Sequence, residues 1–222
     1  MIIWTSNRSL ILGLPLVLAG CLNSQDVTKR DFSLNRPVPD TIAVANQSVV
    51  IGGPPGYCID KGASRLGGDT AFVLLGSCAS IARNVSAGAP TIPGILTASV
   101  TRDGNTDVVG PVALERYILS PDGAAALARD GRAGSVEILG TLRENGAVFI
   151  QLKDTSPNDT PGLADTYWRA LFNLNGRLIT ASVVSFSDKP LSAQAGADTL
   201  RAFLARIRRE TPSGIATLDP QQ

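Results

Sequence analysis

Histidine is absent from this 222-residue chain, and only three residues are cysteine. Without histidine the chain cannot build a Ser-His-Asp triad or a Cys-His pair, and most catalytic zinc sites are excluded as well. Two further signatures of nucleophilic enzymes, Gly-x-Ser-x-Gly and Ser-x-x-Lys, are also missing. The sequence therefore predicts a protein that is not an enzyme and that holds no cofactor.

An excess of charge is missing too, since 20 Lys and Arg residues face 19 Asp and Glu residues. Such a chain has no strong field that would attract nucleic acid, and no nucleic-acid partner is predicted. Hydrophobic residues make up 44% of the chain, which is enough for one domain with a core. The glycine-rich stretch IGGPPGY at 51–57 fits neither the P-loop nor the dinucleotide fingerprint and is interpreted as a turn.

The N-terminal stretch, MIIWTSNRSLILGLPLVLAGC, has the organisation of a bacterial export signal. Arg8 precedes a short apolar run from Leu10 to Leu18, which is too short to span a bilayer stably. The run ends in Leu18-Ala19-Gly20-Cys21, which resembles the lipobox of bacterial lipoproteins. The resemblance implies a signal peptide at 1–20 and lipidation of Cys21. An ordinary secretory signal with an unrelated cysteine is the alternative.

The lipobox predicts localisation at the periplasmic face of a bacterial membrane, with the membrane as partner through the lipid anchor. Leu22 occupies the position where some bacteria use Asp for inner-membrane retention, and the choice between inner and outer membrane stays open. Residues 22–41 are polar, contain two prolines and are interpreted as a tether. A single domain is predicted at 42–210, followed by a loose tail at 211–222.

The remaining cysteines, Cys58 and Cys78, form an even pair in an oxidising compartment. A zinc site needs more ligands than two cysteines provide, and a thioredoxin-type couple needs Cys-x-x-Cys, which is absent. A catalytic cysteine needs a base such as histidine. The pair is therefore predicted to be a structural disulfide.

The apolar pattern predicts strands at the start of the domain, then two short helices, then two hairpins. The stretch at 47–60 predicts two strands around a turn, 70–78 a central strand covered on both faces, and 94–103 another strand. Residues 110–131 favour two short helices split at Pro121. Two hairpins are predicted, with turns at Asn145-Gly146 and Asn175-Gly176.

Side-chain alternation assigns faces to these hairpin strands, and a helix closes the domain. Val136, Ile138 and Leu142 are expected on a buried face, opposite Glu137, Thr141 and Arg143. In the next hairpin Trp168, Ala170, Phe172 and Leu174 share one face. Within 192–210 an apolar stripe predicts an amphipathic helix: Leu200, Phe203, Leu204 and Ile207. The expected class is α+β: an antiparallel β-sheet meander with helices packed on it and a C-terminal amphipathic helix.

Two stretches, VVIGGPPGYCI at 49–59 and GRLITASVVSFSDKPLSAQAGADTLRAFLARIR at 176–208, resemble the PsbP/Mog/DcrB-like superfamily in pattern and element order. The nearest likeness is to the DcrB-type lipoproteins of bacterial envelopes. Members of the superfamily dock on larger assemblies, photosystem II for PsbP and the Ran GTPase for the Mog proteins. The resemblance implies a non-enzymatic accessory or docking module of the cell envelope, with an envelope protein as partner.

The alternative to a docking module is a lipoprotein that binds a small ligand or calcium through acidic loops. Asp103, Asn105 and Asp107 alternate as in an EF-hand loop, but Val108 and Leu114 stand where that loop needs Gly and Glu. The long loop after residue 153 and the strand beside it supply a candidate contact surface: Asp154, Asp159, Asp165, Tyr167 and Arg169.

Two further hypotheses concern charged side chains. A hydrolase that uses carboxylates such as Asp60 and Asp69 is the third functional hypothesis. On the closing helix a set of arginines forms either an ordinary solvated face or a contact with anionic lipid head groups: Arg201, Arg206, Arg208 and Arg209.

Overall fold

The computed structural model describes residues 38–101, 109–157 and 160–213, all within a compact unit at Leu34–Gln222. The predicted signal peptide, Cys21 and most of the predicted tether lie outside the described residues. No helix in the described part of the chain combines the length and the apolar character that a membrane crossing requires.

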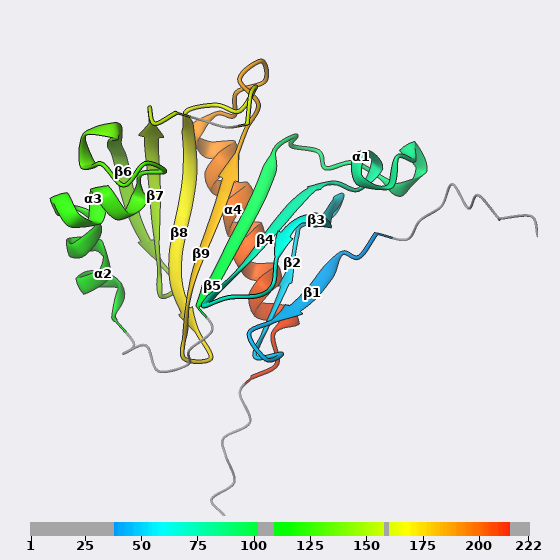
Figure 1. The fold of residues 1–222 in the computed structure, drawn as a ribbon, viewed down its shortest axis with the longest axis horizontal. Coiled ribbons are helices and arrows are strands. Elements are labelled where there is room, and N and C mark those ends of the chain that lie inside the picture. The colour runs from blue at the N-terminus through cyan, green and yellow to red at the C-terminus, as the bar shows by residue number, and fades with distance from the viewer. Residues whose placement is uncertain (1–37, 102–108, 158–159, 214–222) are drawn as a thin grey trace, which may run out of the picture. The chain divides into compact units, whose positions relative to one another are not determined.

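In the described residues nine strands form two antiparallel sheets, which confirms the predicted α+β class. The large sheet has seven strands in the order β3-β4-β5-β9-β8-β7-β6, so that β5 and β9 join two meanders (Figure 1). Its strands are β3 (Tyr57–Arg65), β4 (Thr70–Ser77), β5 (Ile95–Thr101), β6 (Val136–Glu144), β7 (Ala147–Asp154), β8 (Thr166–Leu174) and β9 (Arg177–Val184). The small sheet pairs β1 (Thr41–Val44) with β2 (Val49–Gly52).

Helix α4 (Ala193–Glu210) covers the first face of the large sheet, together with the β1–β2 hairpin. The helix begins where the Ser192 side chain accepts a hydrogen bond from the Ala195 amide, a standard N-cap. The predicted amphipathic helix is confirmed, since all four residues of its apolar stripe are at most 1% exposed: Leu200, Phe203, Leu204 and Ile207.

Two short helices cover the β6 end of the second face of the sheet (Figure 1). These are α2 (Pro111–Ile118) and α3 (Pro121–Leu127), which confirms the predicted split at Pro121. Proline suits the first turn of both helices because its missing amide has no intrahelical partner there. Gly123 allows their close approach, since a Cβ at this position would lie 2.0 Å from the Tyr117 carbonyl oxygen. The core of this layer consists of Leu114, Ile118, Leu127, Val148, Ile150, Leu152 and Tyr167.

Both predicted hairpin turns are confirmed. Asn145 and Gly146 join β6 to β7, and Asn175 and Gly176 join β8 to β9, all with positive φ. Such backbone angles belong to the type I′ turn that these dipeptides favour. Strand β8 also keeps its predicted faces, because Ala170 and Phe172 belong to the core under α4.

The prediction that residues 70–78 are covered on both faces is wrong. In β4 the side chains of Ala71, Val73 and Leu75 are fully buried under the first face, whereas Phe72 and Leu74 are half-buried. Helices α2 and α3 lie at the other end of the second face, and in the described part of the chain α1 (Cys78–Ala82) reaches this half only near Gly76, through Ile81. A continuous apolar run cannot distinguish these two environments.

The alternation predicted for β6 is wrong beyond Ile138. A β-bulge makes Ile138 pair with Leu152 but Gly140 with Gln151, so Leu139 is an extra residue. The bulge brings Thr141 and Arg143 onto the α2 side, where both contact Glu115. Leu142 moves to the opposite face and is 38% exposed.

Candidate functional site

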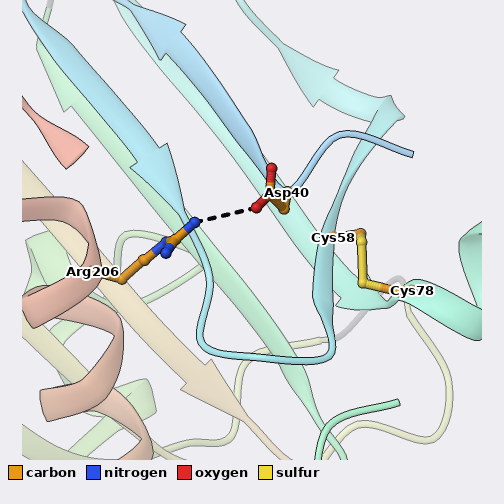
Figure 2. The surroundings of a disulfide bond; sticks show 4 residues. All are labelled: Asp40, Cys58, Cys78 and Arg206. Atoms are coloured by element: carbon orange, nitrogen blue, oxygen red, sulfur yellow. Dashed lines mark hydrogen bonds and ion pairs between the residues drawn. A yellow bond between two sulfur atoms is a disulfide. The ribbon is translucent and has the colours of Figure 1, made fainter. Parts of the chain in front are cut away.

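The predicted disulfide between Cys58 and Cys78 is confirmed, and it joins the start of β3 to helix α1 (Cys78–Ala82) (Figure 2). The Cα atoms are 4.8 Å apart, and both residues are buried. A hydrogen bond of 2.9 Å from the Cys78 amide to the Gly56 carbonyl reinforces the link. The bond fixes the glycine-proline turn at 53–56 relative to α1 and the loop that follows it.

The turn and that loop form one continuous wall. Gly56 has a φ of +86°, and a Cβ at this position would lie 2.5 Å from the backbone of Ala89 and Pro90. Only glycine allows this approach. The Tyr57 hydroxyl donates a 2.6 Å hydrogen bond to the Ile92 carbonyl. Burial raises the pKa of Tyr57 to about 12, so the hydroxyl stays protonated near neutral pH and keeps this bond.

The opposite wall is the outward side of the first half of α4. Ala195, Thr199 and Ala202 succeed one another at helical spacing, and their short side chains leave space above the helix. The Thr199 hydroxyl donates to the Ala195 carbonyl over 2.8 Å, so it is satisfied within its own helix. This wall therefore presents mainly apolar surface.

Between the walls lies a hollow of about 550 Å³, which we call the proline cleft. It continues into a second hollow of about 500 Å³ that shares Pro54, Pro55, Tyr57 and Ala202 with it. Residues of the proline cleft are Pro54, Pro55, Tyr57, Pro90, Thr91, Ile92, Ser192, Gln194, Ala195, Asp198, Thr199 and Ala202.

Among the described residues that line the proline cleft, Asp198 is the only carboxylate. It accepts hydrogen bonds from Gln194 (2.8 Å) and from Arg201 (2.7 Å), and these bonds lower its pKa. A carboxylate held ionised in this way has no proton to donate near neutral pH, and its lowered pKa makes it a weak base. The proline cleft can bind an apolar group through its shape, but its lining supplies no activated nucleophile.

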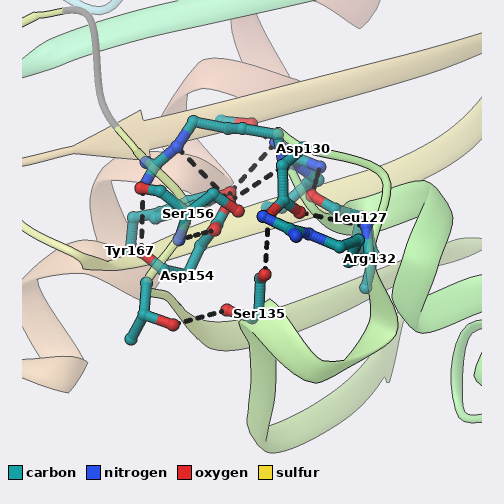
Figure 3. A network of polar contacts seen from close by, with 11 residues as sticks. Leu127, Asp130, Arg132, Ser135, Asp154, Ser156 and Tyr167 are labelled. Atoms are coloured by element: carbon teal, nitrogen blue, oxygen red, sulfur yellow. Dashed lines mark hydrogen bonds and ion pairs between the residues drawn. The ribbon is translucent and has the colours of Figure 1, made fainter.

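Asp154, one of the predicted contact residues, lies in a buried polar network at the end of β7 (Figure 3). Its carboxylate accepts hydrogen bonds from the Ser156 amide (2.9 Å) and the Arg129 amide (3.1 Å), and the Arg129 guanidinium lies 3.5 Å away. Burial alone would raise the pKa of Asp154, but the hydrogen bonds from Ser156 and Arg129 outweigh it and lower the pKa. The network fastens the end of α3 and the loop after β7 to the sheet.

Tyr167 and Arg169 belong to the same network. Tyr167 is 5% exposed, and its hydroxyl accepts a hydrogen bond from Arg169, which also donates to the Leu127 carbonyl and to Ser182. Because Asp154 and Tyr167 are buried, neither lies on an exposed contact surface in this structure. Asp165 is exposed, and Asp159 lies outside the described residues.

The other predicted carboxylate sites show no joint arrangement. Asp103, Asn105 and Asp107 lie outside the described residues. Asp60 accepts hydrogen bonds from the amides of Gly62 and Ala63 where the pairing of β3 with β4 shifts register, and Asp69 is exposed in the loop before β4. Within residues 38–101, 109–157 and 160–213, no group of three or more His, Cys, Asp or Glu side chains is placed to hold a metal ion.

The arginines of α4 are mostly engaged within the protein. Arg201 pairs with Glu144 and Asp198, and Arg206 pairs with Glu210 and with Asp40 at the start of β1 (Figure 2). Arg208 donates to the Asn145 carbonyl and lies 5.0 Å from the Phe172 ring centre. Arg209, 3.4 Å from Glu210, is the most exposed of the paired arginines on this helix. This pairing weakens the case for lipid head groups as their partners.

The proline cleft itself was missed by the sequence reasoning. Its signal is the pair of proline clusters, one in the turn at 53–56 and one at 90–93, on either side of the disulfide. Each cluster predicts a turn by itself, but neither reveals that the two turns meet each other beside α4.

Comparison with known proteins adds little to this site. No protein-family model matches the chain, and no curated protein matches it. Among solved structures, the chain is similar to the solution structure of cyanobacterial PsbP (CyanoP) from Synechocystis sp. PCC 6803. The identity is 12%, the match covers 80% of this chain and 93% of that chain, and the TM-score is 0.37. A TM-score of this size carries no argument for a shared function. A functional proposal therefore has to rest on the cleft and on the sequence signals.

Proposed function

We propose that this protein is a membrane-anchored periplasmic lipoprotein that serves the cell envelope as a non-enzymatic docking module. The observation that carries the proposal is the proline cleft, whose mainly apolar lining lies between two rigid walls. The lipobox at Leu18–Cys21 supplies the anchor and the address. The partner is an envelope protein that inserts an apolar segment into the cleft.

Rigidity makes the cleft suitable for docking. The disulfide, three prolines and the Tyr57–Ile92 hydrogen bond hold its first wall in place. Because this wall is preformed, binding does not have to order a loop of the protein. Such ordering would cost about 0.5–1.5 kcal/mol for each immobilised side chain. Its volume of about 550 Å³ is sufficient for a few side chains of an inserted segment.

Site-specific photo-crosslinking in the native lipoprotein tests the docking role. A photoreactive residue replaces Thr91 on one wall or Gln194 on the other, and Glu137, exposed on β6, serves as the matched control. We expect the same envelope protein to be crosslinked from both walls and not from position 137. Equal crosslinking from all three positions, or none from the two walls, contradicts docking in the cleft.

The anchor has a separate test. Replacing Cys21 by serine removes the acyl acceptor, so Cys21→Ser is expected to release the protein from isolated membranes in a fractionation assay. A Cys21→Ser protein that stays in the membrane fraction contradicts the lipobox interpretation without affecting the interpretation of the cleft.

A small apolar ligand is the second candidate occupant, because the cleft volume lies in the range of small-molecule sites. Native mass spectrometry of the protein isolated from membranes would then show a bound molecule, which Ala202→Trp in the cleft wall should exclude. A rise in melting temperature with calcium would instead favour the acidic loops.

A further inference from the structure

Helix α2 and the residues that flank it carry an apolar surface that faces away from the core. Four of the eight large hydrophobic side chains that are exposed among the described residues fall within 109–119. Their exposed fractions range from 44% to 57%. We call this set the α2 surface, and its members are Val109, Val112, Tyr117 and Leu119.

The surface is separate from the stripe that packs on the sheet. Leu114 and Ile118 point inward and are at most 7% exposed, so the helix already has a buried side. Val112, exposed Arg116 and Leu119 are spaced four and three residues apart, which places them along the outward side of one helix. The outward side chains therefore contribute nothing to the core.

Polar contacts hold this surface in a fixed position. The Glu115 carboxylate accepts a hydrogen bond from Thr141 (2.7 Å) and pairs with Arg143 (3.0 Å), which fastens α2 to β6. At the start of the helix the Asn173 side chain donates to the Val109 carbonyl over 3.1 Å. The α2 surface is thus presented rigidly, and none of its residues lines the proline cleft or the hollow beside it.

We propose that the α2 surface rests on the lipid bilayer and orients the anchored domain, which presupposes the lipid anchor of the proposed function. A protein partner gains most from pockets that enclose anchor side chains, and no residue of the α2 surface lines the proline cleft or the hollow beside it. A bilayer interface needs no pocket. It accommodates aliphatic side chains, favours tyrosine at head-group depth and lets the Arg116 guanidinium extend to the phosphates.

The covalent reach of the chain permits this contact. The described residues begin beside β3, where the Ile59 amide donates to the Pro39 carbonyl over 2.8 Å. Strand β6, which carries α2, is the opposite edge of the large sheet, six strand spacings or about 29 Å away. The chain between Cys21 and Val38 can span up to about 60 Å. The anchor therefore keeps the domain near the bilayer without preventing its far edge from reaching it.

Fluorescence from the lipidated full-length protein in vesicles of phosphatidylethanolamine and phosphatidylglycerol tests the proposal. An environment-sensitive thiol dye is attached at Val112→Cys or Leu119→Cys. Val85→Cys, at a residue that is 90% exposed and far from α2 in the sequence, is the matched control. The native Cys58–Cys78 pair is oxidised and buried, so it does not compete for the dye.

We expect a blue shift at positions 112 and 119, together with a loss of emission when the lipids carry a quencher in their acyl chains, and neither change at position 85. Aqueous-type emission at all three positions, with the protein still bound to the vesicles, overturns the proposal. A blue shift without quenching by the lipids also overturns it, because it indicates a protein contact. A protein that does not stay on vesicles at all instead contradicts the anchor of the proposed function.

Discussion

Removal of the Cys58–Cys78 disulfide should destabilise the domain and loosen the proline cleft. The double variant Cys58→Ala with Cys78→Ala removes only the two sulfur atoms from a buried position. Alanine is preferable to serine here, because a buried hydroxyl without a partner would add its own desolvation cost. The Cys78–Gly56 and Tyr57–Ile92 hydrogen bonds remain, so we expect the variant to fold.

The size of the effect follows from the loop that the bond closes. The cysteines are 20 residues apart in the sequence, and the chain-entropy model then predicts a loss of about 3 kcal/mol in the free energy of unfolding. For a domain of this size each kcal/mol lowers the melting temperature by about 2–4 °C, so the expected decrease is about 6–12 °C.

Thermal unfolding followed by circular dichroism measures the decrease. The oxidised protein, the protein pretreated with a thiol reductant, and the double-alanine variant are compared, and freshly isolated protein should show no free thiol at positions 58 and 78. Reductant should lower the melting temperature of the wild type and leave that of the variant unchanged. A variant as stable as the oxidised wild type would refute the entropic reasoning.

Two further perturbations probe the buried polar groups. Asp154→Ala leaves Arg129 without its buried partner and should lower the free energy of unfolding by about 3 kcal/mol in urea titrations at pH 7. The folded pKa of Asp154 lies below the unfolded value of about 3.9, so its contribution to the free energy of unfolding is present above that pH and is lost as the pH falls through the folded pKa. A difference in the free energy of unfolding between wild type and variant that grows below about pH 4 contradicts this. Tyr57→Phe removes the hydrogen bond to Ile92 and should cost about 1 kcal/mol. Burial raises the pKa of Tyr57 to about 12, so the extra stability of the wild type should be complete below about pH 10 and should decrease between pH 10 and 12. If the difference in the free energy of unfolding stays constant across that range, the hydroxyl does not titrate as the structure implies.

Local patterns predicted much of the fold correctly. The two Asn-Gly turns, the apolar stripe of α4 and the split at Pro121 are determined mainly by residues that are close in the sequence. The bulge in β6 was missed, although Gly140, directly after the extra residue Leu139, is the kind of residue that often marks a bulge inside a strand. The one-sided burial of β4 was missed because its apolar run reads the same with one covered face or two.

The candidate site divides in the same way. The sequence by itself determined the Cys58–Cys78 disulfide and the lack of a histidine-based reaction centre, because both depend on residue types and on spacing along the chain. Only the tertiary structure decided where binding can occur. Asp154 and Tyr167, which resembled surface residues, are buried around Arg129 and Arg169, since a loop residue becomes internal when another segment packs over it. The proline cleft exists because the disulfide and Gly56 bring two distant turns together beside α4, and such a meeting leaves no local pattern in the sequence.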